Sequence, residues 1–212
     1  MKKIIVGTQG NQPFEIKGSS VSRQHAQITI DDNGIWTLED LKSTNGTFVR
    51  DENTGVLRKI SAITIQPMTF ICLGADNSLG CCFYAKQVLS YGKFSEELMY
   101  MRQRDEEFDS EQDKLRKKNS LINIVVRVGA ALLVLGLSFL IIKDDSSIMT
   151  FVRMGLMGCA AYVVPLFYDV NKQKNQIKER QERFHQCPNP ECSHVMSSKE
   201  IQNLYCSKCH AH

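Results

Sequence analysis

The chain has 212 residues, with 26 Lys and Arg against 23 Asp and Glu, and a formal net charge of +3. This length allows one to two small domains, and so small a net charge does not by itself indicate binding to nucleic acid. The chain opens with MKKIIVGTQG, in which the apolar run is too short for a secretory signal.

Residues 1–92 are predicted to form an all-β sandwich. Apolar residues alternate in HAQITI and recur in IWTLEDL, ISAITI and TFICLG. Turn signals at Gly34, Gly46 and Gly55 separate these runs. Many short strands at regular spacing are typical of a sandwich.

The chain has eight cysteines, of which four are clustered at the C-terminus. The other four are expected to be ordinary small core residues, and their scatter does not suggest a secreted disulfide framework. These are Cys72, Cys81, Cys82 and Cys159.

Residues 93–120 change character, with dense mixed charge and no proline. Apolar residues recur every three or four positions with gaps, which predicts a charged helical linker. A coiled-coil seam is the alternative, although Asp105 and Gln112 interrupt it. A second charged helix is predicted at 169–186, as a solvated stalk or as a partner for the first.

Two apolar segments, 121–142 and 148–168, are each long enough to cross a hydrocarbon core of ~30 Å as a helix. The apolar residues of the first segment favour insertion by roughly 6 kcal/mol, which outweighs Arg127 near its end. The second is weaker, because Arg153 offsets much of its gain. Residues 121–168 are therefore predicted to be a two-span transmembrane hairpin, with a buried hairpin of a soluble domain as the alternative.

Basic residues flank the predicted hairpin on both outer sides, while the short loop between the spans carries Lys143 with Asp144 and Asp145. Because Lys and Arg that flank membrane spans tend to stay on the cytoplasmic side, both termini are expected to lie on the cytoplasmic side of the cell membrane. Membrane lipid is therefore an expected partner.

Polar residues gather before the strand HAQITI, in VSRQH, and again at STNGT about twenty residues later. This pair of motifs resembles the core of the forkhead-associated (FHA) domain, with its Ser-Arg-x-His and Ser-x-Asn-Gly-Thr patterns. The resemblance extends from Gly7 to about Leu89. It implies a sandwich that binds phosphothreonine-containing proteins through loops, one of the recurring modes of peptide recognition.

The resemblance assigns roles to seven residues. Phosphopeptide contacts are expected from Ser22, Arg23, Thr44 and Asn45, and structural roles from His25, Gly46 and Thr47. Charged hydrogen bonds from such groups are about twice as strong as neutral ones. The Gly-Arg of the family falls at Gly7-Thr8, so the arginine is replaced, and Lys17 or Arg23 is expected to supply the charge. The alternative is a degenerate FHA fold that serves another contact.

The C-terminal segment 187–212 carries two cysteine pairs, Cys187 with Cys192 and Cys206 with Cys209. Two such pairs provide the four soft ligands of a tetrahedral Zn²⁺ site, and the segment is similar to zinc-ribbon modules. A disulfide pair is the alternative. So short a segment buries little core, so the metal is expected to drive its folding.

No nucleophile-base motif, phosphate-binding loop or open metal position is found in the sequence, so we do not expect an enzyme. The combined prediction is a membrane-tethered cytosolic adaptor that binds phosphothreonine-bearing partners, with homo-oligomerisation left open and no nucleic acid expected. The alternatives are a structural subunit that binds its partner without phosphate, and a nucleic-acid-binding protein acting through the ribbon.

Overall fold

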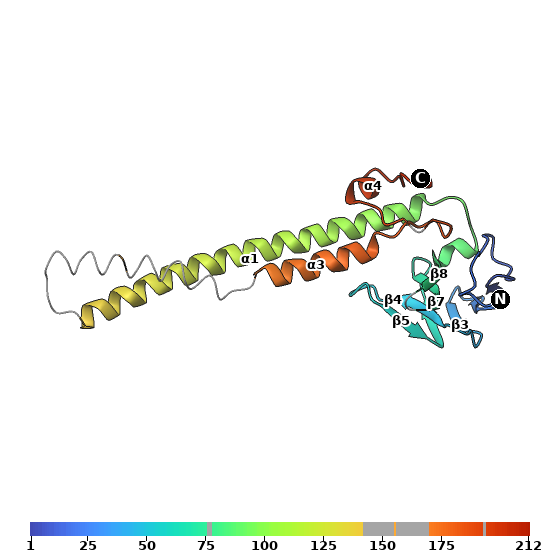
Figure 1. Ribbon diagram of the computed structural model, residues 1–212, viewed down its shortest axis with the longest axis horizontal. Coiled ribbons are helices and arrows are strands. Elements are labelled where there is room, and N and C mark those ends of the chain that lie inside the picture. The colour runs from blue at the N-terminus through green and yellow to red at the C-terminus, as the bar shows by residue number, and fades with distance from the viewer. Residues whose placement is uncertain (76–77, 142–154, 156–169, 193) are drawn as a thin grey trace. The chain divides into compact units, whose positions relative to one another are not determined.

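The computed structural model describes residues 1–75, 78–141, 155, 170–192 and 194–212 (Figure 1). The chain divides into two compact units, one made of Met1–Glu107 with Glu179–His212 and the other of Phe108–Lys178. The first unit therefore joins the N-terminal and C-terminal ends of the sequence.

The first unit contains the predicted β-sandwich. One sheet has the order β1-β2-β3-β6, with β1 (Lys2–Val6), β2 (Ala26–Ile30), β3 (Trp36–Asp40) and β6 (Ala62–Ile65). The other has the order β5-β4-β7-β8, with β5 (Leu57–Ile60), β4 (Thr47–Arg50), β7 (Phe70–Ala75) and β8 (Ser78–Tyr84). All pairings are antiparallel, and a short 3-10 helix, η1 (Ala85–Val88), follows β8.

The predicted strand ISAITI is split between the two sheets. Ile60 ends β5 in one sheet, and Ala62 begins β6 in the other, so the exposed Ser61 is where the chain changes sheet. The predicted turns at Gly34, Gly46 and Gly55 all have positive φ. The sandwich prediction is thus confirmed.

Strands β7 and β8 of the second sheet are buried on both faces. Side chains of a strand alternate between faces, and in β7 Ile71 and Leu73 belong to the sandwich core while Phe70 and Cys72 belong to a second hydrophobic cluster. The same alternation continues in β8. Cover on both sides explains why residues 70–73 in TFICLG are apolar without alternation.

The second cluster is completed by the start of α1 (Ser95–Ile141) and by the C-terminal segment. Leu98 and Met101 of α1 are buried against this face, as are Met196 and Ile201. The C-terminal segment follows α3 (Val170–Phe184) and contains α4 (Ser198–Gln202). The first turns of α1 are therefore packed, in contrast to the solvated linker that the sequence favoured.

Asp105, which interrupts the seam predicted in α1, is buried at 3% exposure. Its Oδ1 accepts hydrogen bonds from His185 Nε2 at 2.8 Å and from Gln181 Nε2 at 2.6 Å. Burial opposes ionisation of Asp105, yet these hydrogen bonds together lower its pKa. The carboxylate thus joins α1 to the segment that leads into the C-terminal cysteines.

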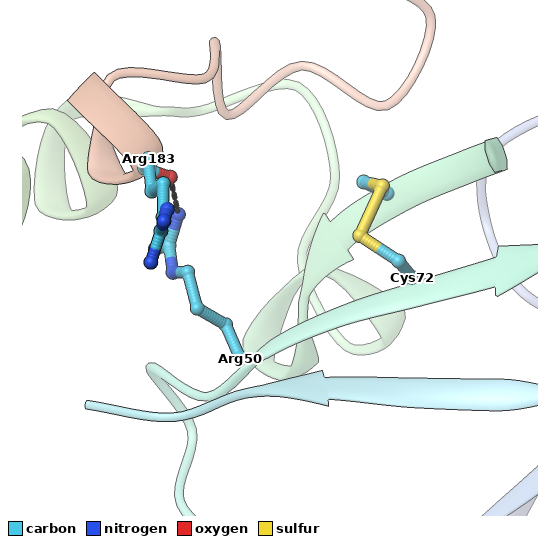
Figure 2. The surroundings of a disulfide bond; sticks show 4 residues. Arg50, Cys72 and Arg183 are labelled. Carbon is cyan, nitrogen blue, oxygen red and sulfur yellow. Dashed lines mark hydrogen bonds between the residues drawn. A yellow bond between two sulfur atoms is a disulfide. The ribbon is translucent and has the colours of Figure 1, made fainter. Parts of the chain in front are cut away.

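Arg50 connects the sandwich to the end of α3. Figure 2 shows its side chain extending from the end of β4 to the main-chain oxygen of Arg183, at 3.1 Å. Its guanidinium lies over Phe70 and Phe184, with its central carbon 4.1 and 4.4 Å from the ring centroids, and it donates to the hydroxyl of Tyr84. Buried arginine needs such partners, because its charge cannot be removed.

Cys72 and Cys82 form a disulfide (Figure 2). They face each other directly in the β7–β8 register, with Cα atoms 4.2 Å apart. The prediction that both are ordinary core thiols is therefore wrong, because sequence alone does not reveal which cysteines are cross-strand neighbours. Cys81 is a free, buried cysteine, as predicted, and Cys159 lies outside the described residues.

The predicted transmembrane hairpin is not confirmed. Residues 121–141 continue α1, and in the part of the chain that the structure describes no helix has the length and apolar character needed to span a bilayer. The second predicted span, 148–168, lies outside the described residues apart from Gly155.

Candidate functional site

The two polar motifs form two loops that meet at one end of the sandwich. The first leads from β1 to β2 and contains Ser22 and His25, and the second joins β3 to β4 and contains Thr44 and Asn45. The Thr44 N–H donates to Ser22 Oγ at 3.3 Å, and Asn45 Nδ2 donates to the Ser20 carbonyl at 2.8 Å. The structure therefore brings the predicted residues of both loops together.

His25 holds the two loops in place. Its side chain is fully buried, Nδ1 accepts a hydrogen bond from the Ser22 N–H at 3.0 Å, and Nε2 lies 2.9 Å from the Gly46 carbonyl. Since Nδ1 accepts, the ring proton must be on Nε2, which then donates to Gly46. The bracing role inferred for His25 fits these contacts.

Asp40 organises the second loop, a role that the sequence analysis missed. Its Oδ2 accepts from Ser43 Oγ and from the buried Thr47 Oγ1, both at 2.6 Å, while Oδ1 accepts from the Ser43 N–H. Burial of the carboxylate opposes ionisation, but these hydrogen bonds together lower the pKa of Asp40. The available signal was an acidic residue at the end of a strand, directly before the polar motif.

A pH dependence follows from Asp40. A carboxyl group whose pKa is lowered by folding stabilises the folded state at pH values above its ordinary pKa of about 3.9. This stabilisation is lost as the pH falls through the lower pKa of the folded state. Asp40→Asn should therefore cost about 2 kcal/mol of unfolding free energy at pH 7 and less below pH 3. Urea titrations at both pH values measure this, with the exposed Asp32→Asn as control. An equal cost at both pH values would contradict the assignment.

The exposed tips of both loops are available to a ligand. Arg23 and Thr44 are exposed, and Ser22 and Asn45 are half-buried. Asn45 Nδ2 is already used by Ser20, which leaves its amide oxygen as the group that could meet a peptide N–H.

Gly7 and Gly46 permit close approaches at these loops. A Cβ on Gly7 would lie 2.3 Å from the Arg23 carbonyl oxygen, and the following Thr8 N–H donates to the Ser22 carbonyl, so Thr8 lies beside the first loop. Gly46 has φ of 101°, and a Cβ there would meet Lys59 Cε at 2.4 Å. Lys59 thus lies against the second loop, which the sequence did not reveal, whereas Lys17 pairs with Glu15 at 2.9 Å.

The family model of the FHA domain matches residues 4–74, a range that contains both loops. Residues 4–74 form an FHA domain. FHA domains are binding modules, which agrees with the prediction that the chain is not an enzyme. A comparison with curated proteins gave no match.

Three solved structures of FHA domains are similar to part of this chain. The FhaA FHA domain, crystallised with the intracellular domain of Rv3910, is 30% identical, with 34% of this chain and 71% of that chain covered and a TM-score of 0.28. The FHA domain of CT664 from Chlamydia trachomatis is 33% identical, with coverages of 34% and 68% and a TM-score of 0.28. Mycobacterium tuberculosis Rv1747 FHA-1 is 20% identical, with coverages of 37% and 74% and a TM-score of 0.30.

A second candidate site lies beside the FHA domain, where four cysteines converge. The sulfur atoms of Cys187, Cys192, Cys206 and Cys209 all lie within 4.8 Å of one another, and all four are free thiols. Two of the Sγ–Sγ distances are 3.6 and 4.0 Å. A tetrahedron with zinc–sulfur bonds of about 2.3 Å has sulfurs roughly 3.8 Å apart, so this cluster fits a tetrahedral metal ion.

Two backbone turns present these thiols. The Cys192 N–H donates to the Asn189 carbonyl in the first turn, and the His210 N–H donates to the Cys206 carbonyl in the second. Between them, Ser197 and Glu200 form a capping box at the start of α4. The five-residue spacing of the first pair is therefore compatible with a compact cluster.

Burial is the main cause that raises the pKa of the thiols of Cys187 and Cys192. Both thiols thus stay protonated at neutral pH unless a cation replaces their protons. A divalent metal would supply that charge, because thiolates are the form that binds zinc. His194 is not one of the four clustered thiols, but its ring nitrogen and a Glu200 carboxylate oxygen both lie within 4.8 Å of the Cys206 sulfur, and they pair with each other at 3.2 Å.

Proposed function

We propose that this chain is an adaptor whose FHA domain binds a phosphothreonine-bearing segment of a partner protein at the tips of the 22–23 and 44–45 loops. The observation that carries the proposal is the convergence of Ser22 Oγ with the Thr44 amide across two loops. Because Ser22 Oγ accepts that hydrogen bond, its hydroxyl hydrogen can be donated to a phosphate oxygen.

The positive charge for the phosphate would come from two side chains. Arg23 is exposed in the first loop, and Lys59 reaches the second loop over Gly46. Together they would replace the family arginine, whose position is taken by Thr8. Two cations that hydrogen-bond a dianionic phosphate favour it strongly over a neutral threonine hydroxyl.

Matched peptide arrays test this function. The full chain should bind degenerate peptides centred on phosphothreonine at least about tenfold more tightly than the same peptides with threonine. Equal binding of both sets would instead favour the alternative, in which the FHA fold recognises a partner without phosphate.

We further propose that the cysteine cluster binds one Zn²⁺, with Cys187, Cys192, Cys206 and Cys209 as its ligands. The ion would supply charge to four thiolates and fix the two turns, and no open coordination position would remain for catalysis. The module that it stabilises packs on the outer face of the second sheet, which gives the metal a structural role in the adaptor.

Attachment to a membrane is a separate proposal, supported by sequence alone. Residues 121–142 and 148–168 are rich in Leu, Ile, Val and Phe, and basic residues flank them on the same side. After cell lysis and an alkaline carbonate wash, the full chain should remain in the membrane pellet and be released by detergent. Recovery in the aqueous supernatant would contradict the tether.

A further inference from the structure

The unit formed by Phe108–Lys178 contains a cavity of about 640 Å³ between α1 and α3. Figure 1 shows α3 running alongside α1. The α1 residues that line the cavity recur at helical spacing, so they share one face of the helix. They are Gln112, Asp113, Leu115, Arg116, Asn119, Ser120, Asn123, Ile124 and Arg127, and Lys174 lines it from α3.

The cavity is positively charged. Arg116, Arg127 and Lys174 contribute three cations, against the single carboxylate of Asp113. Arg116 and Arg127 are about 16 Å apart along the helix axis, given the rise of 1.5 Å per residue. The cavity therefore suits an elongated anion better than a small spherical one.

Asn119, which lines this cavity, has a buried side-chain donor that no described residue satisfies. Its side chain is 3% exposed, and among the described residues its Nδ2 has no hydrogen-bond partner. A buried donor left unsatisfied costs about 1–3 kcal/mol. Since Asn119 lies one helical turn from Arg116, a single anionic group could receive hydrogen bonds from both.

Apolar side chains are exposed on α1 at the level of the last cavity residues and beyond them. These side chains, which are 55–69% exposed, are those of Leu121, Ile124, Val125, Val128 and Leu132. A cationic cavity with an unpaired donor, next to an exposed apolar surface, matches a molecule that has an anionic head and hydrocarbon chains.

We propose that this cavity binds the headgroup of an anionic phospholipid, with the phosphate between Arg116, Asn119 and Lys174 and the acyl chains along the apolar surface of α1. This site is separate from the phosphothreonine site, and it does not depend on that proposed function.

The test is a titration of the full chain in neutral detergent micelles with fluorescently labelled phosphatidic acid, followed by anisotropy. Phosphatidylcholine and inorganic phosphate serve as competitors. Arg116→Gln and Asn119→Leu should each weaken binding about tenfold, because each removes a hydrogen bond to a charged group. The matched control is Lys118→Gln, which removes one charge from an exposed position that does not line the cavity, and it should change affinity less than twofold.

Thermal unfolding separates lost binding from lost folding. Without lipid, Asn119→Leu should melt at the same temperature as the native chain or higher, because the buried unpaired amide is gone. The proposal would be overturned if both cavity variants bound the lipid as tightly as the native chain, or if Lys118→Gln weakened binding as much as they do. It would also be overturned if inorganic phosphate displaced the labelled lipid as readily as unlabelled phosphatidic acid does.

Discussion

Cys206→Ser is expected to abolish zinc binding and to unfold the C-terminal module. A tetrahedral site held by four thiolates loses most of its affinity when one ligand is replaced by a hydroxyl, and the apparent binding energy of structural zinc, about 10–16 kcal/mol, is also folding energy. Because Cys206 is fully buried in the cluster that covers the second sheet, the damage should extend to the FHA domain. We expect its thermal midpoint to fall by about 10 °C.

Elemental analysis of the purified chain, combined with thermal unfolding, measures both effects. The native chain should contain one zinc per molecule, and Cys206→Ser almost none. Cys81→Ser is the matched control, since Cys81 is equally a buried free cysteine but belongs to the sandwich core. A native chain without zinc, or a Cys206→Ser chain that retains it, would show that these four cysteines do not form the metal site.

His25→Ala is expected to cost about 3 kcal/mol of unfolding free energy and to abolish phosphopeptide binding. The substitution leaves a cavity and removes the acceptor of the Ser22 N–H. The Gly46 carbonyl loses one of its two donors and keeps the Gly74 N–H, at 3.2 Å. Both loops should then lose their fixed positions. Denaturant unfolding gives the first effect, and peptide titration gives the second.

The control for His25→Ala is Gln24→Ala, which changes an exposed neighbour in the same loop and should alter stability by less than 0.5 kcal/mol. If His25→Ala costs less than about 1 kcal/mol, or if its peptide affinity equals that of the native chain, His25 does not hold the loops as inferred.

Sequence patterns predicted the parts of this protein that depend on local order. Alternating apolar residues located the strands, and the spacing of Cys187, Cys192, Cys206 and Cys209 predicted their convergence. The two polar motifs likewise predicted that Ser22 and Thr44 meet. In each case the signal lies within a short segment or in a repeated spacing.

The remaining contacts depend on long-range packing, which leaves little trace in sequence. Within TFICLG, the four residues 70–73 are all apolar, so they do not reveal that one face of the sheet covers the sandwich core while the other receives α1 and the C-terminal module. Asp105 looked like an interruption in a helix because its partner, His185, lies 80 residues away. Lys59 was missed for the same reason, since its place beside the second loop appears only when β4 and β5 are aligned. Asp40 is different, because its partners Ser43 and Thr47 are close in sequence and the signal was local.

Isothermal titration of the full chain with a phosphothreonine peptide, repeated with Ser22→Ala, tests the central claim most directly. Ser19→Ala, at an exposed serine of the same loop, provides the control. We expect phosphorylation of the threonine to strengthen binding at least about tenfold, Ser22→Ala to remove most of that gain, and Ser19→Ala to preserve it. Equal affinity for the phosphorylated and unphosphorylated peptides, or for native chain and Ser22→Ala, would contradict the account.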